Sequence, residues 1–386
     1  MPNPYTPGNP ANPDCFGGRI KILEKVRENI ENAREQKRNG GVLVCGHRGV
    51  GKSSLIEKAV SLVRTDRTGN QTNALVACRR LSRTTSDQEI YQILIEEMKG
   101  QVLERRSIIE RMGRAVNRIN ALKAFEIGID LEKENNDRNL SPYMQWKTMM
   151  FGLQNADYVL IALDDADYLS PEALSELKTI VETRLPTPIL LVIAGGADFA
   201  PRLHSEYSPI ERVFTDASFN LGAFTREETK EVLEKPLAGE RTTWTEGGID
   251  AVQRYTSGFP YLVQCVAKAA YAENQEIDEK RVEESVKSAV KSAGSVLDRE
   301  LIQASDQDIV CFDKISLTKK TMLKSSEITS AGVSPPYIGR LVKLGALKLV
   351  SRGRYHLEKS PMIAAYHMLK RGLHRGPGDI SNRTGR

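Results

Sequence analysis

The residues that most clearly indicate a chemical function form a glycine-rich segment that ends in lysine and serine. They directly follow the apolar run Val42–Cys45. A buried strand that passes through glycines into a helix points backbone amides and the positive end of the helix dipole at a bound phosphate. The segment fits the phosphate-binding pattern GxxxxGK[ST] through Gly46, His47, Arg48, Gly49, Val50, Gly51, Lys52 and Ser53.

Each fixed position of this pattern has a chemical task. The glycines allow backbone amides to approach phosphate oxygens, and the Lys52 ammonium reaches the β- and γ-phosphates. The Ser53 hydroxyl is a hard oxygen ligand suited to Mg²⁺, and Ser54 follows it at the start of the helix. The segment therefore predicts a site for ATP and Mg²⁺.

A second apolar run, Tyr158–Leu163, ends in two acids, Asp164 and Asp165. This pattern predicts a central strand that is buried on both faces and whose carboxyl end meets the phosphate site. We expect Asp164 to orient Mg²⁺ through water and Asp165 to polarise the attacking water. Asp167 is the next candidate for the second task.

Length and composition indicate a multidomain protein. A chain of 386 residues exceeds what one core usually supports, so two or three domains are expected. Its 5 cysteines are scattered, which is typical of reduced thiols. No apolar run approaches the ~18 residues of a membrane span, and the first residues lack an export signal. We therefore expect a cytoplasmic protein without a membrane partner.

The net charge of +5 conceals an asymmetry along the chain. Residues 311–386 hold 15 Lys and Arg against 4 Asp and Glu, a net charge of +11 that leaves −6 for the rest. A basic terminal domain favours an anionic partner such as nucleic acid. A solvated basic surface is the alternative.

The order of apolar runs predicts βαβ alternation and hence a parallel sheet. The strand Ala74–Cys78 follows the phosphate-binding helix, and further strands are expected at Pro188–Ala194 and Phe219–Leu221. Ser170 and Pro171 begin a helix after the acidic strand. The expected divisions are an extended lead (1–15), a core (16–225) with an insertion at about 101–150, a helical domain (226–296), a basic domain (297–370) and a basic flexible tail (371–386).

The insertion has two parts to which the sequence assigns no function. The first, from Arg105 to Arg118, is basic and helical in pattern. The second, Phe125–Glu132, alternates like a half-exposed strand.

The basic domain is predicted to be a winged helix. A helix through Ile309–Ile315 and a short one near Ser326–Ser330 precede a third helix, which Ser334 caps. A β-hairpin with a basic tip follows. Such a module places its third helix in the major groove and its wing on the backbone or in the minor groove. The candidate DNA contacts are Tyr337, Arg340, Lys343, Arg352 and Arg354. A module that contacts protein instead is the alternative.

The order of motifs resembles a known group of ATPases. Phe16-Gly17-Gly18-Arg19 is similar to the GR box of origin-recognition AAA+ proteins and of STAND and archaeal-type ATPases. The glycine-rich segment, LDDAD at Leu163–Asp167 and GFP at Gly258–Pro260 resemble their Walker A, Walker B and GxP motifs. PYTPG near the start and ERVF at Glu211–Phe214 resemble a prokaryotic branch. The resemblance covers about residues 4–370.

The resemblance implies an α/β fold, an ASCE-type P-loop parallel sheet with a helical lid and a C-terminal winged-helix domain. It places Arg19 near the adenine and Pro260 beside the nucleotide. Asp165 stands where many AAA+ enzymes have Glu, and Ala194-Gly195-Gly196 offers no polar sensor at the end of the fourth strand. GFPYLVQ also lacks the lid arginine of origin-recognition proteins. Slow hydrolysis of ATP is therefore expected.

An arginine finger, if the protein has one, must then come from elsewhere in the chain. Arg212 lies between the fourth and fifth strands, and Arg202 is a second candidate. A finger is worth on the order of 10³ to 10⁵ in rate. A surface ion pair is the alternative for Arg212.

These observations together predict a nucleotide-dependent switch that binds and slowly hydrolyses ATP. Two readings stay open. The protein either binds DNA through its winged helix under the control of ATP, or is a signalling or defence scaffold that forms homo-oligomers on ATP and contacts protein.

Overall fold

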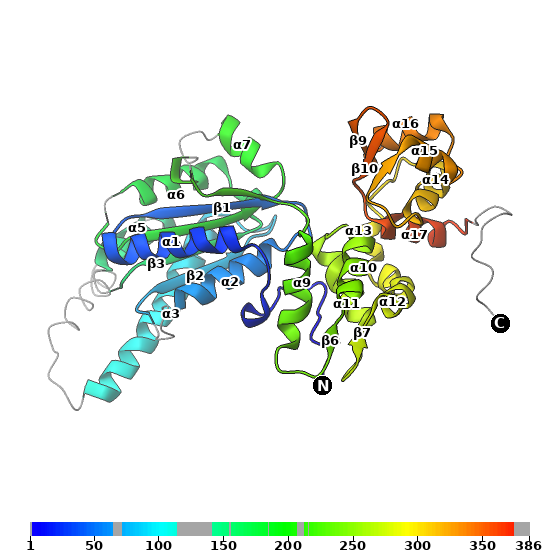
Figure 1. Ribbon diagram of the computed structural model, residues 1–386. Coiled ribbons are helices and arrows are strands. Elements are labelled where there is room, and N and C mark those ends of the chain that lie inside the picture. The colour runs from blue at the N-terminus through cyan, green and yellow to red at the C-terminus, as the bar shows by residue number, and fades with distance from the viewer. Residues whose placement is uncertain are drawn as a thin grey trace. The chain divides into compact units, whose positions relative to one another are not determined.

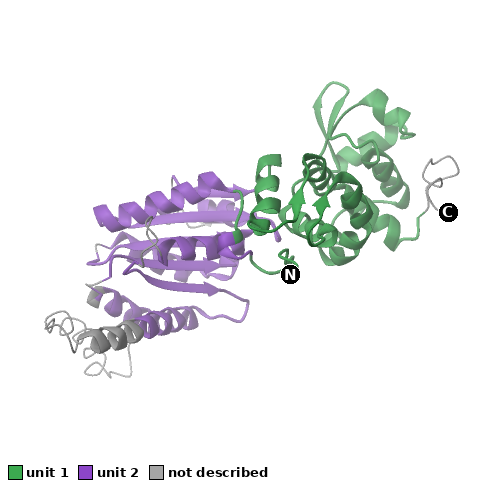
Figure 2. Ribbon diagram, turned by 60° about the horizontal axis from the view of Figure 1, so that its bottom comes forward, with its two compact units in different colours: residues 1–10, 15–18, 223–386 green, residues 11–14, 19–222 purple. Residues whose placement is uncertain are grey.

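The computed structural model describes residues 2–64, 72–113, 141–153, 156–183, 185–206, 212–214 and 216–373. The chain divides into two compact units (Figure 2). The sheet unit comprises residues 11–14 and 19–222, and the helical unit comprises residues 1–10, 15–18 and 223–386. The predicted strand at Phe125–Glu132 and most of the predicted basic tail lie outside the described residues.

The sheet unit is built on 5 parallel strands in the order β2-β3-β4-β1-β5 (Figure 1). The strands are β1 (Gly40–Gly46), β2 (Leu75–Arg80), β3 (Val159–Asp164), β4 (Ile189–Gly195) and β5 (Ser218–Leu221). The predicted parallel sheet of four buried strands and a short fifth is confirmed. Because parallel strands end at one edge, the glycine-rich segment after β1 and the acids after β3 share that edge.

Helices follow the strands as the apolar periodicity predicts. Ser170 caps one of them by accepting a hydrogen bond from the Ala173 amide at 3.0 Å, with Pro171 in the first turn. The basic part of the expected insertion is helical as far as Gly113. The described helices of this unit are α1 (Ile20–Gln36), α2 (Lys52–Arg64), α3 (Asp87–Gly113), α5 (Pro142–Gly152), α6 (Pro171–Glu182) and α7 (Phe199–Glu206).

Helices cover both faces of the sheet, which explains why its central strands are apolar without alternation. Leu43, Ile161 and Ile193 share one buried cluster with side chains of α3, α5, α6 and α7. Alternate residues such as Val44 and Ala162 point to the opposite face, where α1 packs on β1 and α2 packs on β3. The sheet is thus a rigid platform for the loops at its carboxyl edge.

The helices predicted between 226 and 295 are present in the helical unit. The interruption predicted at 256–260 separates two of them, and a short parallel strand pair joins the bundle. The elements are α9 (Arg226–Glu234), β6 (Thr243–Trp244), α10 (Glu246–Thr256), α11 (Pro260–Ala270), β7 (Glu276–Ile277), α12 (Glu279–Ser292) and α13 (Gly294–Leu297).

The proline-rich lead is anchored in the core of the helical unit. The Tyr5 side chain is 1% exposed, its hydroxyl donates to the Leu233 carbonyl, and the Trp244 indole donates to it at 2.8 Å. Its ring also meets those of Trp244 and Tyr271 edge-on. Burial raises the pKa of the Tyr5 phenol well above its usual range. One aromatic residue therefore fixes a segment that forms no strand and only a short 3-10 turn.

The C-terminal module, residues 305–370, combines helices with a three-stranded antiparallel sheet in the order β8-β10-β9. The predicted helices and hairpin are present, and β8 adds a third strand. The helix α17 packs on α10, α12 and α14, so the module shares one buried core with the helices before it. The elements are α14 (Asp306–Ser316), β8 (Met322–Lys324), α15 (Ser325–Ser330), α16 (Pro335–Lys343), β9 (Leu347–Ser351), β10 (Arg354–Leu357) and α17 (Pro361–Lys370).

The predicted cap at the start of α16 is wrong in one respect. Ser334 occupies the capping position, but its side chain makes no cap hydrogen bond to a described residue. Pro335 and Pro336 have no amide hydrogen to offer, and the Tyr337 amide bonds to the Ser334 carbonyl at 3.0 Å instead. The two prolines start this helix without help from the serine hydroxyl.

Candidate nucleotide-binding site

The glycine-rich segment forms a tight loop between β1 and α2. Gly49 and Gly51 have φ of 83° and 96°, values that disfavour any residue with a Cβ. Val50 is 2% exposed and holds the loop to the core, whereas His47 and Arg48 are exposed. Because α2 starts at Lys52, the unpaired amides of its first turn point toward this loop.

Lys52 lies across the loop that it follows. Its ammonium donates to the Gly46 carbonyl at 2.8 Å and to the His47 carbonyl at 3.2 Å. A phosphate in the loop would compete for the same donor hydrogens. Burial raises the pKa of the adjacent Cys45 thiol to about 11, so this thiol stays protonated at neutral pH.

Ser53 and Asp164 meet under the loop. The Ser53 hydroxyl donates to a carboxylate oxygen of Asp164 at 2.6 Å, and the Asp164 side chain is only 5% exposed. The other Asp164 oxygen accepts the Asp165 amide at 3.0 Å. A hydroxyl and a carboxylate side by side are the hard oxygen donors that Mg²⁺ prefers, so these residues fit the predicted metal.

Asp165 has different surroundings from its neighbour. Its backbone is left-handed, with φ 55° and ψ 44°. One of its carboxylate oxygens accepts a hydrogen bond from the Arg80 guanidinium at 2.7 Å, and this bond raises the pKa of Arg80. Arg80 ends β2, the strand paired with β3. Sequence reasoning missed Arg80, because only the strand order places β2 beside the acidic strand.

The end of β4 has no room for a polar side chain. A Cβ on Gly195 would lie 2.5 Å from the Phe199 ring, and one on Gly196 would lie 2.9 Å from Asp167. The Gly196 amide donates to the Asp167 carboxylate at 2.7 Å. Asp167 thus fills the space at this strand end that a sensor side chain would need.

Comparison with known proteins assigns the chain to a family. The model of the family described as Novel STAND NTPase 1 matches residues 7–285, more than half of the chain. The chain belongs to this family. Among curated protein sequences, none matches the chain significantly.

Several solved structures are similar to this STAND NTPase over most of its length. ORC2 of Aeropyrum pernix, determined in ADPNP and ADP complexes, is 12% identical over 92% of this chain and 95% of its own, with a TM-score of 0.53. Cdc6p of Pyrobaculum aerophilum is 13% identical over 96% and 97%, with a TM-score of 0.48. The RuvB branch migration motor of Thermotoga maritima is 15% identical over 94% and 96%, with a TM-score of 0.44. The predicted membership of the STAND group is confirmed by the family model.

The GR box of the STAND NTPase lies where the chain passes between its units. In the helical unit, the Gly18 amide donates to Glu231 at 2.9 Å, and a Cβ on Gly17 would lie 2.9 Å from the Glu231 backbone. In the sheet unit, Arg19 has a left-handed backbone and donates to the Gly222 carbonyl at 2.5 Å. A role of Arg19 near adenine stays a prediction.

The GxP motif is built into the helical unit. Gly258 has φ 71°, and a Cβ there would lie 2.2 Å from the Phe224 carbonyl. The Phe224 amide donates to the Gly258 carbonyl at 2.8 Å. Pro260 is buried at the first turn of α11. The motif therefore fixes the start of α9 against the turn between α10 and α11.

The two finger candidates of the STAND NTPase differ in their surroundings. Arg202 donates to the Asp167 carbonyl at 3.2 Å and lies over the Phe199 ring, 5.2 Å from its centroid. Arg212 is exposed in a short 3-10 turn, Arg212–Phe214, ahead of β5. The contacts of Arg202 thus lie within the sheet unit. The finger role of Arg212 stays a prediction.

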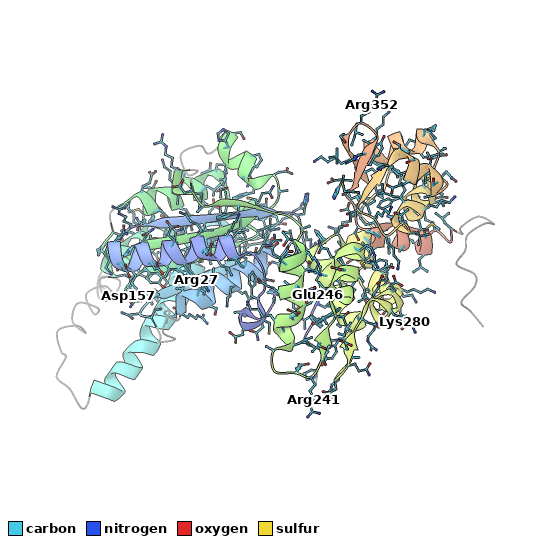
Figure 3. The ribbon with its side chains drawn as sticks, viewed as in Figure 1. Arg27, Asp157, Arg241, Glu246, Lys280 and Arg352 are labelled. Atoms are coloured by element: carbon cyan, nitrogen blue, oxygen red, sulfur yellow. The ribbon has the colours of Figure 1, made fainter. Side chains whose placement is uncertain are left out.

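The predicted DNA contacts occupy unlike positions. Lys343, Arg352 and Arg354 are exposed. Arg340 instead forms an ion pair with Asp308 at 2.7 Å and lies over the half-buried Tyr337 ring. The structure brings the two hairpin arginines to the tip of the C-terminal module, where Arg352 points outward (Figure 3).

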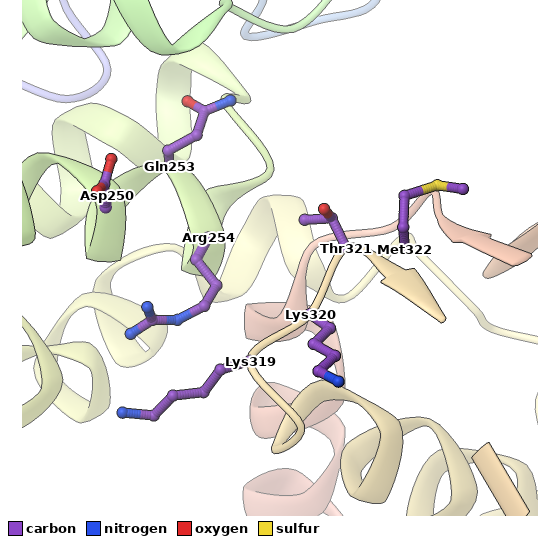
Figure 4. A pocket seen from close by; sticks show the side chains of 7 residues that line it. All are labelled: Asp250, Gln253, Arg254, Lys319, Lys320, Thr321 and Met322. Carbon is purple, nitrogen blue, oxygen red and sulfur yellow. The ribbon is translucent and has the colours of Figure 1, made fainter. Parts of the chain in front are cut away.

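A pocket of about 420 Å³ lies between α10 and the segment before β8 (Figure 4). Two of its cations, Arg254 and Lys319, extend side by side and share the carboxylates of Glu279 and Glu283 on α12. The charges of these two cations are therefore balanced by neighbouring carboxylates. It joins the last turn of α10 to the C-terminal module. Its lining residues are Asp250, Gln253, Arg254, Lys319, Lys320, Thr321 and Met322.

No helix among the described residues is both long enough and apolar enough to span a bilayer.

Proposed function

We propose that this STAND NTPase binds ATP with Mg²⁺, hydrolyses it slowly and uses its nucleotide state to control a DNA-binding module. The observation that carries the nucleotide half is the 2.6 Å hydrogen bond from Ser53 to Asp164 beneath the loop. These two residues would hold Mg²⁺, while Lys52 and the loop amides would hold the phosphates. The metal would neutralise charge on the phosphates.

Turnover in this proposal belongs to Asp165. Its free carboxylate oxygen would orient the attacking water, since Arg80 holds the other one. A carboxylate one methylene shorter than Glu and a strand end without a polar sensor favour slow hydrolysis. Such a protein would dwell in its ATP state, which suits a switch.

The DNA half rests on the C-terminal module. Its order of helix, strand, two helices and hairpin resembles that of a winged helix, and this order supports the proposal. Exposed cations at the hairpin and on α16 favour a polyanion as the partner. We propose duplex DNA, bound with an affinity that depends on nucleotide.

A second candidate is an ATP-dependent scaffold that contacts protein. Exposed apolar side chains on the small sheet favour it, with Met322, Leu349 and Val350 at 45%, 53% and 56% exposure. In this case ATP would drive homo-oligomers, with Arg212 supplied to a neighbouring copy. If the protein is such a scaffold, its molecular mass in solution should increase when ATP is added, and it should have no affinity for DNA.

Titration calorimetry tests the nucleotide site. Lys52→Ala removes the ammonium from the phosphate loop, so ATP affinity should fall at least about tenfold while the thermal midpoint of the unliganded protein is kept. Lys25→Ala, which removes a half-buried ammonium from α1, is the matched control and should bind like the parent. Equal ATP affinity of Lys52→Ala and the parent would reject the site.

Gel shifts with duplex DNA, with and without MgATP, test the second half. If DNA affinity falls more steeply with salt concentration when nucleotide is added, the result supports DNA binding. Oligomers that form on ATP without DNA affinity support the scaffold.

A further inference from the structure

The cations of the C-terminal module fall into two groups. One group makes ion pairs that hold the module together, among them Arg340 with Asp308, Lys320 with Glu327 and Lys370 with Asp298. The other group has no ion pair with any described residue. Apart from Lys314, this second group gathers on the hairpin, on β8 and at the end of α16 and comprises Lys324, Lys343, Lys348, Arg352 and Arg354.

Arg340 is structural because its partner is buried. Its Nε and Nη2 donate to the two carboxylate oxygens of Asp308, each at 2.7 Å, and Asp308 is 0% exposed. The Arg340 guanidinium lowers the pKa of Asp308 to about 2. Removing this arginine to contact a base would leave a buried carboxylate without its counter-charge. Arg340 therefore anchors α16 to α14.

The rest of α16 offers little for reading bases. Its first turn holds Pro335 and Pro336, which carry no side-chain donor, and Gly339 occupies another exposed position. Tyr337 is half-buried against the core. Lys343 in the last turn is the one ammonium on this helix. A recognition helix normally supplies donors from its N-terminal turns. In α16 these turns carry only the half-buried Tyr337 hydroxyl and the Arg340 guanidinium, which is bonded to Asp308.

The small sheet carries its cations on the outward face. Arg354 lies directly opposite Lys324, and His356 lies opposite both Met322 and Lys348. Directly opposite residues of antiparallel strands share a face. The other face carries Leu323, Leu347 and Leu357, which are 2%, 2% and 4% exposed and pack in the core. The outward face therefore presents Lys324, Lys348 and Arg354, and the turn beyond it presents Arg352 (Figure 3).

This face places two cations directly opposite each other, an arrangement that a polyanion would favour. Like charges directly opposite each other on neighbouring strands destabilise a sheet, and Arg354 and Lys324 are such a pair. Neither side chain forms an ion pair with a described carboxylate, although the Glu327 carboxylate accepts the Lys324 amide at 2.7 Å and so lies near this lysine. The acids Glu327 and Glu358 at its margins instead pair with Lys320 and His356.

We infer that the outward face of β8-β10-β9, with the turn at Arg352, binds the phosphate backbone of duplex DNA without base readout by α16. This inference rests on the proposed DNA binding and names its surface. The contact is sequence-tolerant, because phosphates carry no sequence information. It reverses the expected division of labour, in which α16 reads the major groove.

The test compares two triple variants of the full chain. Lys324→Gln/Lys348→Gln/Arg354→Gln removes the sheet cations, and Lys280→Gln/Lys287→Gln/Lys291→Gln removes equal charge from α12. Affinities for two duplexes of unrelated sequence are measured across a salt series with MgATP. The sheet variant should lose at least about tenfold in affinity and about 2–3 units of the salt slope on both duplexes. The α12 variant should keep the parental slope.

Three controls make the outcome decisive. Relief of the opposed charges should leave the thermal midpoint of the sheet variant unchanged or higher, so lost binding is not lost folding. An unchanged slope in the sheet variant, with weakened binding or altered sequence preference in Lys343→Gln, would overturn the inference and leave DNA binding intact. A parent protein without affinity for either duplex at low salt would overturn both and favour an acidic protein partner.

Discussion

Two neighbouring carboxylates at the end of β3 have different surroundings. Asp164 is buried and bonded to the Ser53 hydroxyl, a position that fits the proposed metal. Asp165 turns away through a left-handed backbone and meets Arg80. Aspartate tolerates this conformation better than most residues do. In the proposed function, this turn would let one strand end serve both metal and water.

The first prediction at this scale separates ATP binding from turnover. Asp165→Asn keeps the size of the side chain but removes the charge that orients water, so it should hold ATP and hydrolyse it at least about tenfold more slowly. Phosphate release and calorimetry measure the two properties. Glu172→Gln, on the exposed first turn of α6, is the matched control. Unchanged phosphate release would transfer the role to Asp167.

The second residue prediction concerns Arg80. Its guanidinium occupies one carboxylate oxygen of Asp165, so Arg80→Ala should free that oxygen and raise kcat about threefold or more without changing KM. Arg83→Ala removes the same charge from the following loop and should leave kcat unchanged. A lower kcat in Arg80→Ala would instead mean that Arg80 positions Asp165 for catalysis.

At the scale of elements, the C-terminal module is held by pairs between helices. The Arg340–Asp308 pair joins α16 to α14, and the Arg254 and Lys319 pairs join α10 to the segment before β8 through α12. The last turn of α10 also leads directly into Gly258 of the GxP motif. One helix therefore connects that motif to the ion pairs that hold the module.

The Arg340–Asp308 pair predicts a pH dependence with a defined sign. Because the folded pKa of Asp308 is lowered, the stabilisation is present above its unfolded value of about 3.9 and is lost as pH falls toward about 2. Arg340→Ala should lower the thermal midpoint at pH 7 by several degrees, and its difference from the parent should shrink through this window. Lys343→Ala on the same helix should show no such window. A constant difference would contradict the role of the pair.

At the scale of the whole molecule, nucleotide and DNA must be linked if the proposed switch is correct. Thermodynamic linkage requires each ligand to change the affinity of the other by the same factor, typically about 5–150-fold. The Asp165→Asn variant, which should retain ATP, allows both affinities to be measured without turnover. Lys52→Ala should bind DNA with no response to ATP. DNA affinity that is equal with ATP, ADP and no nucleotide would show two independent functions in one chain.

The sequence by itself determined the elements and the phosphate loop. The run Val42–Cys45, the loop to Ser53 and the acids after Leu163 are each contiguous, so their local patterns predict strand, turn and helix without knowledge of the rest. Parallel strands end at one edge, which also predicted that Ser53 and Asp164 share a site. A local pattern likewise predicted the hairpin and its basic tip.

Tertiary structure alone decided which side chains become partners. Arg80 meets Asp165 because the strand order puts β2 beside β3, and no local pattern states that order. Arg340 has the spacing of an outward residue, yet Asp308, 32 positions earlier, takes its charge. Tyr5 is likewise buried by residues more than two hundred positions away. Periodicity reports which face a residue occupies, whereas the free energy of pairing depends on what the fold brings to that face.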